Sequence, residues 1–585
     1  MKPTFSRKLY ALPPVIWAIV MLFLTLTPAQ EMPRTPDWKL VAFDTAAHAG
    51  VFAVLAVLSW VALRRQQRWP ALARQAGLAV LAGCVLFGGL IEVLQYLMAV
   101  GRQAEWSDLG GDSLGAALAL LLAGGGWRWW QRRRLAASLL LLLLLGSSYF
   151  FAPPARAQAP DLGRARRTIE ALASPKLHGR GYVRGGEHLA AAYLRGRLRQ
   201  LGLQPLAPGY TQPFTLDVNT FPGKAEMMLL TQPPRSLVPG RDFITAPESG
   251  PWHSTGRYQA VPLDTLVFTD STAWHQYLIP YARPDGSRPK PGPETIARLN
   301  QAIVVRARDE VRLAQLPPAM QRYLAQRPHF TLVPKLTASL ATQQVFAPHL
   351  EIVAGSWPTS STKEFFTLQV DAQLIHHYPT QNLAAVVRGR TQPDSFLVVS
   401  AHYDHLGMMG SQTYFPGAND NASGVALLLE LAAHYARPEN QPACSVVFLL
   451  FGAEEAGLLG SQYFVAHPLV PLPRIKFLVN LDLLGTGEEG ATVVNGKVFE
   501  PAYQRLTALN DAHHYLPRLT ARGRAANSDH FPFSEAGVPA FFMYTRGGSP
   551  AYHDVHDQPA ALSLVGFAGA FGLVRDFLDE LGAKP

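Results

Sequence analysis

Histidine and acidic side chains follow each of three short apolar runs in the C-terminal half of the chain. These are His402 and Asp404 after Phe396–Ala401, Glu454 and Glu455 after Val446–Phe451, and Asp482 after Phe477–Leu481. Runs of this length, rich in Val, Phe and Leu, are typical of strands buried on both faces of a sheet. Because the carboxyl ends of parallel strands meet at one edge, where ligands bind, we expect these side chains to converge there.

Helical patterns separate the apolar runs. The segment Ala422–Tyr435 has a helical period, and a second helical pattern begins after Glu455. Alternating strands and helices predict an α/β fold with a mostly parallel sheet and right-handed crossovers. Asp420 lies in the loop GANDNASG, where turn-forming residues precede the first of these helices.

So many carboxylates at one sheet edge would repel each other unless a cation lay among them. Imidazole with carboxylate and without thiolate is typical of catalytic zinc sites. The only cysteines, Cys84 and Cys444, are too few for a disulfide framework or a thiolate site. Two ions ~3.5–4 Å apart would need a bridging carboxylate and further ligands. The segment AYHDVHD adds another histidine, His553. We therefore predict two zinc ions.

Chemistry alone suggests separate roles for the acidic residues. A zinc ion lowers the pKa of water and polarises a carbonyl group, and a nearby glutamate can then act as general base. Adjacent Glu454 and Glu455 point differently, so one can face the metal and the other the water. His402 and Asp404 are two residues apart and share a face in an extended segment. Asp404 could therefore orient the imidazole of His402 as a carboxylate beyond the metal ligands.

Six motifs in one order carry a family resemblance: HYDH, GANDNASG, GAEEAGLLGS, NLD, SDHFPF with GVPAFF, and YHDVHD. Together they resemble the two-zinc aminopeptidase family of secreted bacterial leucyl aminopeptidases and their yeast vacuolar relatives. The resemblance implies a zinc-dependent aminopeptidase that hydrolyses the N-terminal bond of peptides. It also implies roles for individual positions: His402 and Asp482 at one zinc, Glu455 and His553 at the other, Asp420 bridging, Glu454 as general base, and Tyr552 holding the tetrahedral intermediate.

Other polar residues in these motifs have simpler interpretations. His405, His530 and His556 are expected to cap, to form hydrogen bonds or to lie at the surface. Asp529 and Asp557 are expected to be structural or to support the metal ligands from behind. Two alternative functions stay open: a glutaminyl-cyclase-like acyltransferase and a catalytically inactive ectodomain that binds peptides. The intact GANDNASG and EEAGLLGS patterns and the complete predicted ligand set favour the peptidase.

Charge and length limit the broader possibilities. At 585 residues, the chain is long enough for about three domains. The net charge is +10, but the first 160 residues contain 15 Lys and Arg against 7 Asp and Glu. The remaining residues are therefore nearly neutral, and the basic pI gives no argument for a nucleic-acid partner.

The first 134 residues have the pattern of an all-α membrane helical bundle. Four apolar stretches in this part predict membrane helices, because about 20 apolar residues span a bilayer: Leu9–Thr27, Thr45–Leu63, Ala76–Val100 and the shorter Ser113–Trp127. A fifth stretch, Leu135–Ala155, follows directly. Basic clusters between them favour a multi-pass protein of the cell (inner) membrane, with the lipid bilayer as a partner and residues 160–585 on the extracytoplasmic side.

Three motifs in this part resemble the VanZ-like domain: FDTAAHAG, IEVLQ and GRQAEWSDLGGDSLG. The stretch at 135–160 has a basic start, a leucine-rich core and an Ala-rich end. It therefore fits either a fifth transmembrane segment or a signal-peptide-like tether.

The remaining residues divide into a catalytic domain and an insertion. Two helices are expected in Asp161–Leu203, and a closing helix in Leu562–Leu581. The catalytic domain is predicted at 161–234 and 371–585. Residues 235–370 are predicted to form an inserted β-rich module, because they are rich in Pro, Gly and short β-like runs that include Ala302–Val305 and His329–Val333.

Overall fold

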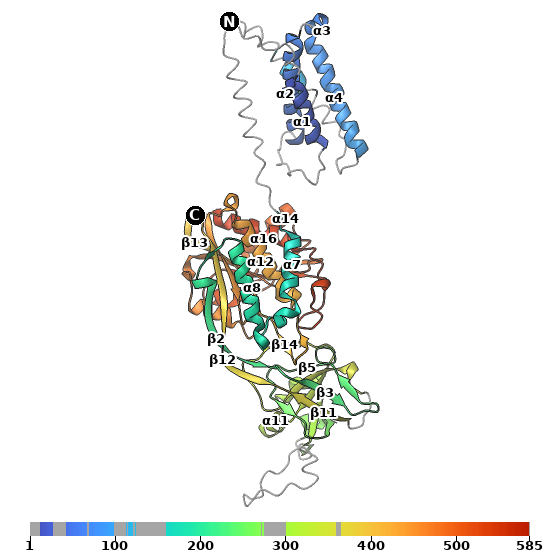
Figure 1. Ribbon diagram of the computed structural model, residues 1–585, viewed down its shortest axis with the longest axis vertical. Coiled ribbons are helices and arrows are strands. Elements are labelled where there is room, and N and C mark those ends of the chain that lie inside the picture. Colours follow the sequence, from blue (N-terminus) through green and yellow to red (C-terminus); the bar gives the residue numbers. More distant parts are fainter. Residues whose placement is uncertain are drawn as a thin grey trace, which may run out of the picture. The chain divides into compact units, whose positions relative to one another are not determined.

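The computed structural model describes residues 12–26, 43–66, 69–98, 113, 115–120, 123, 159–270, 272–273, 300–358 and 364–583. The chain divides into two compact units, Met1–Gln158 and Ala159–Pro585. Each unit has its own buried core, and they are described separately (Figure 1).

The first unit contains helices α1 (Leu12–Leu26), α2 (Phe43–Arg65), α3 (Pro70–Arg74) and α4 (Ala76–Met98). Side chains from α1, α2 and α4, among them Met21, Phe52 and Cys84, form a shared apolar core. The indole of Trp17 on α1 donates a hydrogen bond to the carbonyl oxygen of Val51 on α2, at 3.1 Å.

Among the described residues, no helix is both long enough and apolar enough to cross a membrane. Helix α1, for example, has 15 residues and is about 22 Å long, whereas the hydrocarbon core of a bilayer is about 30 Å thick. Helix α2 carries charged residues at both ends, Asp44 and Arg64–Arg65. The predicted all-α membrane bundle and the predicted multi-pass location in the inner membrane are therefore corrected. The apolar stretch Leu135–Ala155 and part of Ser113–Trp127 lie outside the described residues.

The second unit is built on a central sheet whose described strands have the order β1-β12-β16-β13-β17-β20-β18-β19, with β2 paired to β12. The bounds are β1 (Gln204–Pro205), β2 (Thr211–Thr220), β12 (Gln373–Val387), β13 (Gln392–His402), β16 (Cys444–Phe451), β17 (Ile475–Leu481), β18 (Gly490–Val494), β19 (Leu519–Ala521) and β20 (Ala540–Arg546). Strands β16, β13, β17 and β20 are mutually parallel. The predicted α/β fold with a mostly parallel sheet is therefore confirmed for this part.

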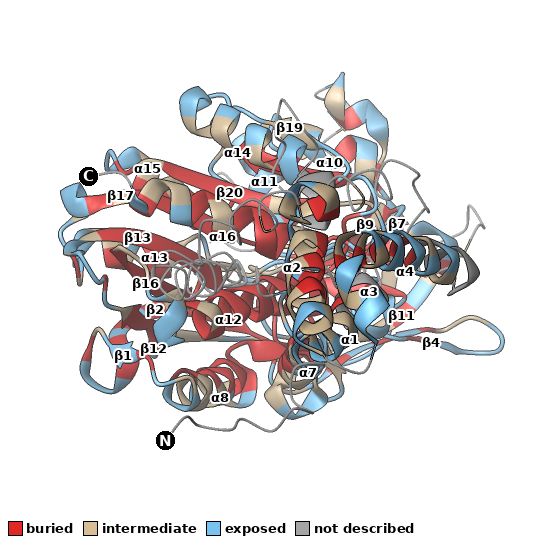
Figure 2. Cartoon of the chain, turned by 90° about the horizontal axis from the view of Figure 1, so that it is seen from above, coloured by how far each residue is buried: buried red, intermediate tan, exposed pale blue. Residues whose placement is uncertain are grey.

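Both faces of the central sheet are covered, so its strands are apolar at successive positions (Figure 2). One face packs against α7 (Leu162–Leu172), α8 (Gly186–Gln200), α12 (Gly424–Tyr435), α14 (Glu500–His513) and α16 (Phe567–Ala583). The other face packs against α13 (Leu459–Ala466) and α15 (His530–Glu535). Along β13, Leu397 and Val399 face the first group of helices, while Phe396 and Val398 face the second.

The helices predicted in this unit are present, but their ends differ from the predicted ones. Two helices, α7 and α8, lie in the segment expected to contain them, and α7 begins after Asp161, whose side chain accepts a hydrogen bond from the backbone of Arg164. The closing helix α16 begins at Phe567, five residues later than expected. The preceding backbone is held elsewhere, because the N–H groups of Leu564 and Gly566 donate to the carbonyl oxygens of Gly485 and Thr486.

A second sheet is formed by strands between Ala225 and Val370, and the helices described in this region lie beside it (Figure 1). Its elements are β3 (Ala225–Leu229), β4 (Arg235–Leu237), β5 (Phe243–Thr245), β6 (Trp252–His253), β7 (Tyr258–Pro262), β8 (Gln301–Arg306), α10 (Ala307–Leu313), α11 (Pro318–Ala325), β9 (His329–Val333), β10 (His349–Val353) and β11 (Glu364–Val370). The predicted β-like runs Ala302–Val305 and His329–Val333 fall on β8 and β9. The exact domain boundaries stay a prediction.

Two long strands join the sheets. Strand β2 pairs antiparallel with β12 from Thr220 and Gln373 to Thr211 and Leu383, and the chain passes directly from β2 into β3 and from β11 into β12. The second sheet is therefore tied to the catalytic part by a two-stranded ribbon, visible between the two bodies of this unit in Figure 1.

Candidate metal centre and active site

The predicted site residues meet at the carboxyl edge of the parallel strands. His402 is the last residue of β13, Asp482 follows β17, and Glu454 and Glu455 follow β16 after a short turn. Asp420 precedes α12, and every residue of its segment, Ala418–Ser423, is buried. The loop after β20 brings His553 to the same place. The convergence that parallel strands predict is therefore present.

One half of the site contains His402, Asp420 and Asp482. The Nε2 atom of His402 lies 3.3 Å from Oδ1 of Asp420 and 3.4 Å from Oδ1 of Asp482. The carboxylate of Glu454 is next to them, with Oε2 at 4.0 Å from the same nitrogen. All four side chains are nearly inaccessible to solvent.

The other half contains His553, Asp420 and Glu455. The Nε2 atom of His553 lies 3.0 Å from Oδ2 of Asp420 and 3.2 Å from Oε2 of Glu455. The two oxygens of Asp420 thus face different histidines, Oδ1 toward His402 and Oδ2 toward His553. A carboxylate in this position has the orientation that a bridge between two ions requires.

These donors fit zinc by their spacing and chemistry. Ligand atoms around a tetrahedral zinc ion, bound at ~2.0–2.1 Å, are separated by about 3.3 Å, close to the 3.0–3.4 Å found between these nitrogen and oxygen atoms. In addition, Oδ1 of Asp482 is buried and accepts no hydrogen bond in the structure. A buried carboxylate oxygen without a hydrogen-bond partner is costly, and a cation would satisfy it.

The charges of the site also favour a bound cation. Burial raises the pKa of Glu454 well above its usual range, and the carboxylates of Asp529, Glu455 and Asp482 raise it further. Burial opposes protonation of His553, but Glu455 and Asp420 raise its pKa to about 11. A metal ion bound there would take the place of that proton, so metal binding should release protons.

Two predicted residues have contacts that differ from expectation. The carboxylate of Asp404 is 3.8 Å from Nδ1 of His402, which instead approaches the backbone oxygen of Asp404 at 3.3 Å. The carboxylate accepts hydrogen bonds from the backbone N–H groups of Glu454 (3.1 Å) and Glu455 (3.4 Å). Asp404 therefore positions the turn that carries both glutamates. Tyr552 is 45% exposed, and its ring stacks on that of His553 at 4.0 Å. Its predicted contact with an intermediate stays a prediction.

Three residues outside the predicted set support the ligands. Ser528 donates a hydrogen bond to Oδ2 of Asp482 at 3.0 Å and accepts one from Asn480 at 2.8 Å. His405 is buried, with Nδ1 at 2.7 Å from Oε1 of Glu455. The motifs SDHFPF and NLD contain this serine and this asparagine. Their side chains meet because β17 lies beside the loop before α15. Only the fold places them together.

Removal of the Ser528 hydroxyl is expected to weaken zinc binding by roughly 10–100-fold, the usual range for a residue that orients a metal ligand. In Ser528→Ala, Asp482 keeps its charge but loses the hydrogen bond that fixes one of its oxygens. A competition titration with a coloured chelator would measure the affinity. Ser534→Ala is the matched control, because Ser534 contacts Asn495 and no predicted ligand. Equal affinities in the two variants would contradict this role for Ser528.

The loop that bears Asp420 is held by buried polar groups. Asp557 accepts hydrogen bonds from the backbone N–H groups of Asn419 and Asp420, at 2.8 Å and 3.0 Å. The guanidinium of Arg180 donates to five backbone carbonyl oxygens, those of Leu172, Tyr403, Pro416, Gly417 and Asp420. Asp557 is thus structural, as its interpretation from sequence predicts, whereas Arg180 lies outside the motifs and was not predicted.

The region of the second sheet also reaches the site. Nδ1 of His553 lies 2.8 Å from the carbonyl oxygen of Ala338, and the N–H of Ala338 donates back to the His553 carbonyl at 2.9 Å. Lys335 donates to the carbonyl oxygen of Pro550 at 2.8 Å. Because a metal-binding histidine is usually oriented through its second ring nitrogen, the segment after β9 fixes the orientation of His553.

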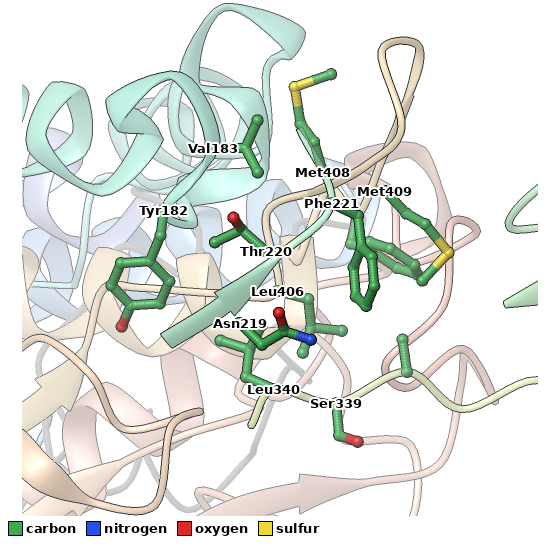
Figure 3. Close-up of a pocket in the computed structure, with 12 residues that line it drawn as sticks. Tyr182, Val183, Asn219, Thr220, Phe221, Ser339, Leu340, Leu406, Met408 and Met409 are labelled. Carbon is green, nitrogen blue, oxygen red and sulfur yellow. The ribbon is translucent and has the colours of Figure 1, made fainter. Parts of the chain in front are cut away.

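A pocket lies beside this segment (Figure 3). Its walls are formed by Tyr182 and Val183, the end of β2, the segment Ala338–Leu340 and the residues that follow His405. Most of the lining side chains are apolar, including Val183, Phe221, Leu340, Leu406, Met408 and Met409. The pocket is small, and its volume of about 20 Å³ is room for about one water molecule.

Residues 382–577 match the family model of Peptidase family M28. The C-terminal part of the chain is a peptidase family M28 domain. This match includes every predicted metal-binding residue, from His402 to His553. The described strands β13, β16, β17 and β20 and helices α12, α13, α14 and α15 all lie within it. The resemblance of the N-terminal part to the VanZ-like domain stays a prediction.

Several known proteins are similar to part of this chain. Aminopeptidase YwaD of Bacillus subtilis is 31% identical over 238 residues, which are 39% of this chain and 50% of that protein. Leupeptin-inactivating enzyme 1 of Streptomyces exfoliatus is 33% identical over 154 residues, 26% of this chain and 33% of that protein. The chain thus spans half or less of these relatives. The solved structure of BSAP, a zinc aminopeptidase from Bacillus subtilis, matches 72% of this chain and 95% of its own, with a TM-score of 0.52 and 19% identity, and so shares the fold.

Proposed function

We propose that this chain is a zinc-dependent aminopeptidase that removes the N-terminal residue from peptides. The observation that carries the proposal is the carboxylate of Asp420, whose two oxygens lie 3.3 Å and 3.0 Å from the imidazoles of His402 and His553. The M28 match and the aminopeptidases among the relatives support the same reaction.

Two zinc ions would be held by five side chains of this chain. His402 and Asp482 would bind one ion, His553 and Glu455 the other, and Asp420 both. Each histidine faces two carboxylate oxygens, so the donors supply a separate group of ligands for each ion. Bound zinc would polarise the scissile carbonyl and lower the pKa of the attacking water.

The protein groups around this site would move the proton and orient the reactants. Glu454 would take a proton from the attacking water and return it to the leaving amine. Its backbone N–H is fixed by Asp404, so its side chain projects from a rigid turn toward His402. A free α-amine is cationic, and the carboxylates of this edge supply the negative charge that would bind it. By analogy with the leucyl aminopeptidases that the motifs resemble, the N-terminal residue of the substrate would be apolar, such as leucine.

The proposal is tested by following residue release from a leucyl peptide with a free N-terminus and from its N-acetylated form. We expect the chain, loaded with zinc, to cleave only the free peptide and to lose activity in a chelator. Activity should return when zinc is added back. Cleavage of both peptides would indicate an endopeptidase and contradict the recognition of the α-amine.

A peptide that begins with glutamine separates the cyclase alternative. Conversion of that residue to pyroglutamate, without release of an amino acid, would contradict the aminopeptidase proposal. Binding of zinc without either reaction would favour a catalytically inactive domain that binds peptides.

A further inference from the structure

We propose that the second sheet contains a further zinc site, formed by Glu310, His329 and His349. The three residues lie on different elements, α10, β9 and β10, and each offers one ligand atom within 4.8 Å of the others. None of them belongs to the proposed catalytic centre or to the part of the chain matched by the M28 family model.

The register of two strands brings the histidines together. Strands β9 and β10 are parallel, and His329 and His349 are directly paired, so their side chains emerge on the same face. Their rings stack with centroids 3.8 Å apart. The pair therefore presents two imidazole rings, a common type of metal ligand, side by side on one face of the sheet.

The carboxylate of Glu310 completes the set. Its Oε1 atom is 3.7 Å from Nε2 of His329, about 0.4 Å more than the separation of about 3.3 Å between ligands of one zinc ion. Its Oε2 atom accepts a hydrogen bond at 2.6 Å from Thr331, whose hydroxyl is also 2.7 Å from Nε2 of His349. A small movement of Thr331 from between these two groups would allow both to contact one ion.

The site is open to an ion from solvent. The side chains of His329 and Glu310 are 19% and 32% exposed, in contrast to the nearly inaccessible catalytic residues. Glu351 is two residues beyond His349 on β10 and lies on the same face, which adds negative charge. Three protein ligands are enough to hold a zinc ion, with water in the fourth position. An ion here would link α10, β9 and β10.

The test is a count of bound zinc in the full-length chain after removal of metal and reloading, by elemental analysis of the dialysed protein. We expect His349→Gln and Glu310→Gln each to bind one ion fewer per chain than the unmodified protein. Glutamine can keep the hydrogen bonds to Thr331 but is a poor zinc ligand. Equal counts in all three proteins would overturn the proposal.

Thr331→Val is the matched control, because it removes the bridging hydroxyl and no proposed ligand. It should keep the full number of ions, and a loss as large as in His349→Gln would overturn the assigned ligand set. Activity toward a leucyl peptide distinguishes this site from the catalytic one. His349→Gln should retain at least half of the activity, whereas a loss of both activity and a zinc ion would assign the missing ion to the catalytic centre and overturn the proposal.

Discussion

Glu454→Gln is expected to lower kcat by roughly 10²–10⁴-fold while the chain keeps its zinc, the range for removal of one general acid–base group. Glutamine has nearly the same shape but cannot accept the proton of the attacking water. Glu454 is next to His402, with its Oε2 atom 4.0 Å from the ring nitrogen, and is the carboxylate of the pair that does not face His553. Steady-state kinetics with a leucyl peptide and a zinc count on the same sample would measure both effects.

The neighbouring residue supplies the matched control. Glu455 faces His553 at 3.2 Å and accepts from His405, so Glu455→Gln should lose one zinc ion as well as activity. The two adjacent, isosteric substitutions thus separate a base from a ligand. Unchanged turnover in Glu454→Gln, or loss of zinc from it, would contradict the proposed division of roles.

Arg180→Met is expected to lower the free energy of unfolding of the second unit by about 3–5 kcal/mol, the cost of breaking a buried charged network. The Arg180 side chain is fully buried, and its five hydrogen bonds are 2.8–3.1 Å long. Methionine would leave five carbonyl oxygens without this donor, in a region where water cannot replace it. Burial lowers the pKa of Arg180 to about 10, so the group remains charged at neutral pH.

This variant should also bind zinc more weakly, because Arg180 holds the backbone of Asp420 and Gly417. Chemical unfolding of the metal-free protein, monitored by tryptophan fluorescence and circular dichroism, would isolate the structural part of the effect. Arg184→Met is the control, since Arg184 is exposed and, within the described part of the chain, donates one long hydrogen bond, 3.4 Å to the carbonyl oxygen of Ser411. Arg180→Lys should be intermediate, because lysine keeps the charge but has three donors instead of five. Equal stability of Arg180→Met and Arg184→Met would contradict the proposed role.

The order of apolar runs and polar ends determined most of the catalytic part. Strands buried on both faces leave a strong local signal, and the right-handed crossover rule places their carboxyl ends together. His402, Glu455 and Asp482 could therefore be predicted at one edge, and the structure places them there. The family resemblance then paired individual residues with expected roles.

The apolar stretches of the first unit show the limit of such patterns. Length and hydropathy predicted membrane helices, but the described helices have other bounds. Helix α2 (Phe43–Arg65), for example, extends beyond the predicted stretch Thr45–Leu63 at both ends and carries charged residues there. A composition pattern has no information on where backbone hydrogen bonding ends, so it does not fix the ends of a helix.

Contacts between distant segments were decided only by tertiary structure. The sequence indicates His553 as a candidate metal ligand. The residue whose carbonyl oxygen orients its ring, Ala338, is 215 residues away and lies after β9. Arg180 likewise has no local pattern, since its partners come from three separate segments of backbone. Local sequence determines strands, helices and the type of chemistry at their ends. Long-range packing decides which group orients each of these side chains. A backbone carbonyl oxygen can accept a hydrogen bond whatever the side chain of its residue, so the sequence gives no sign of such a contact.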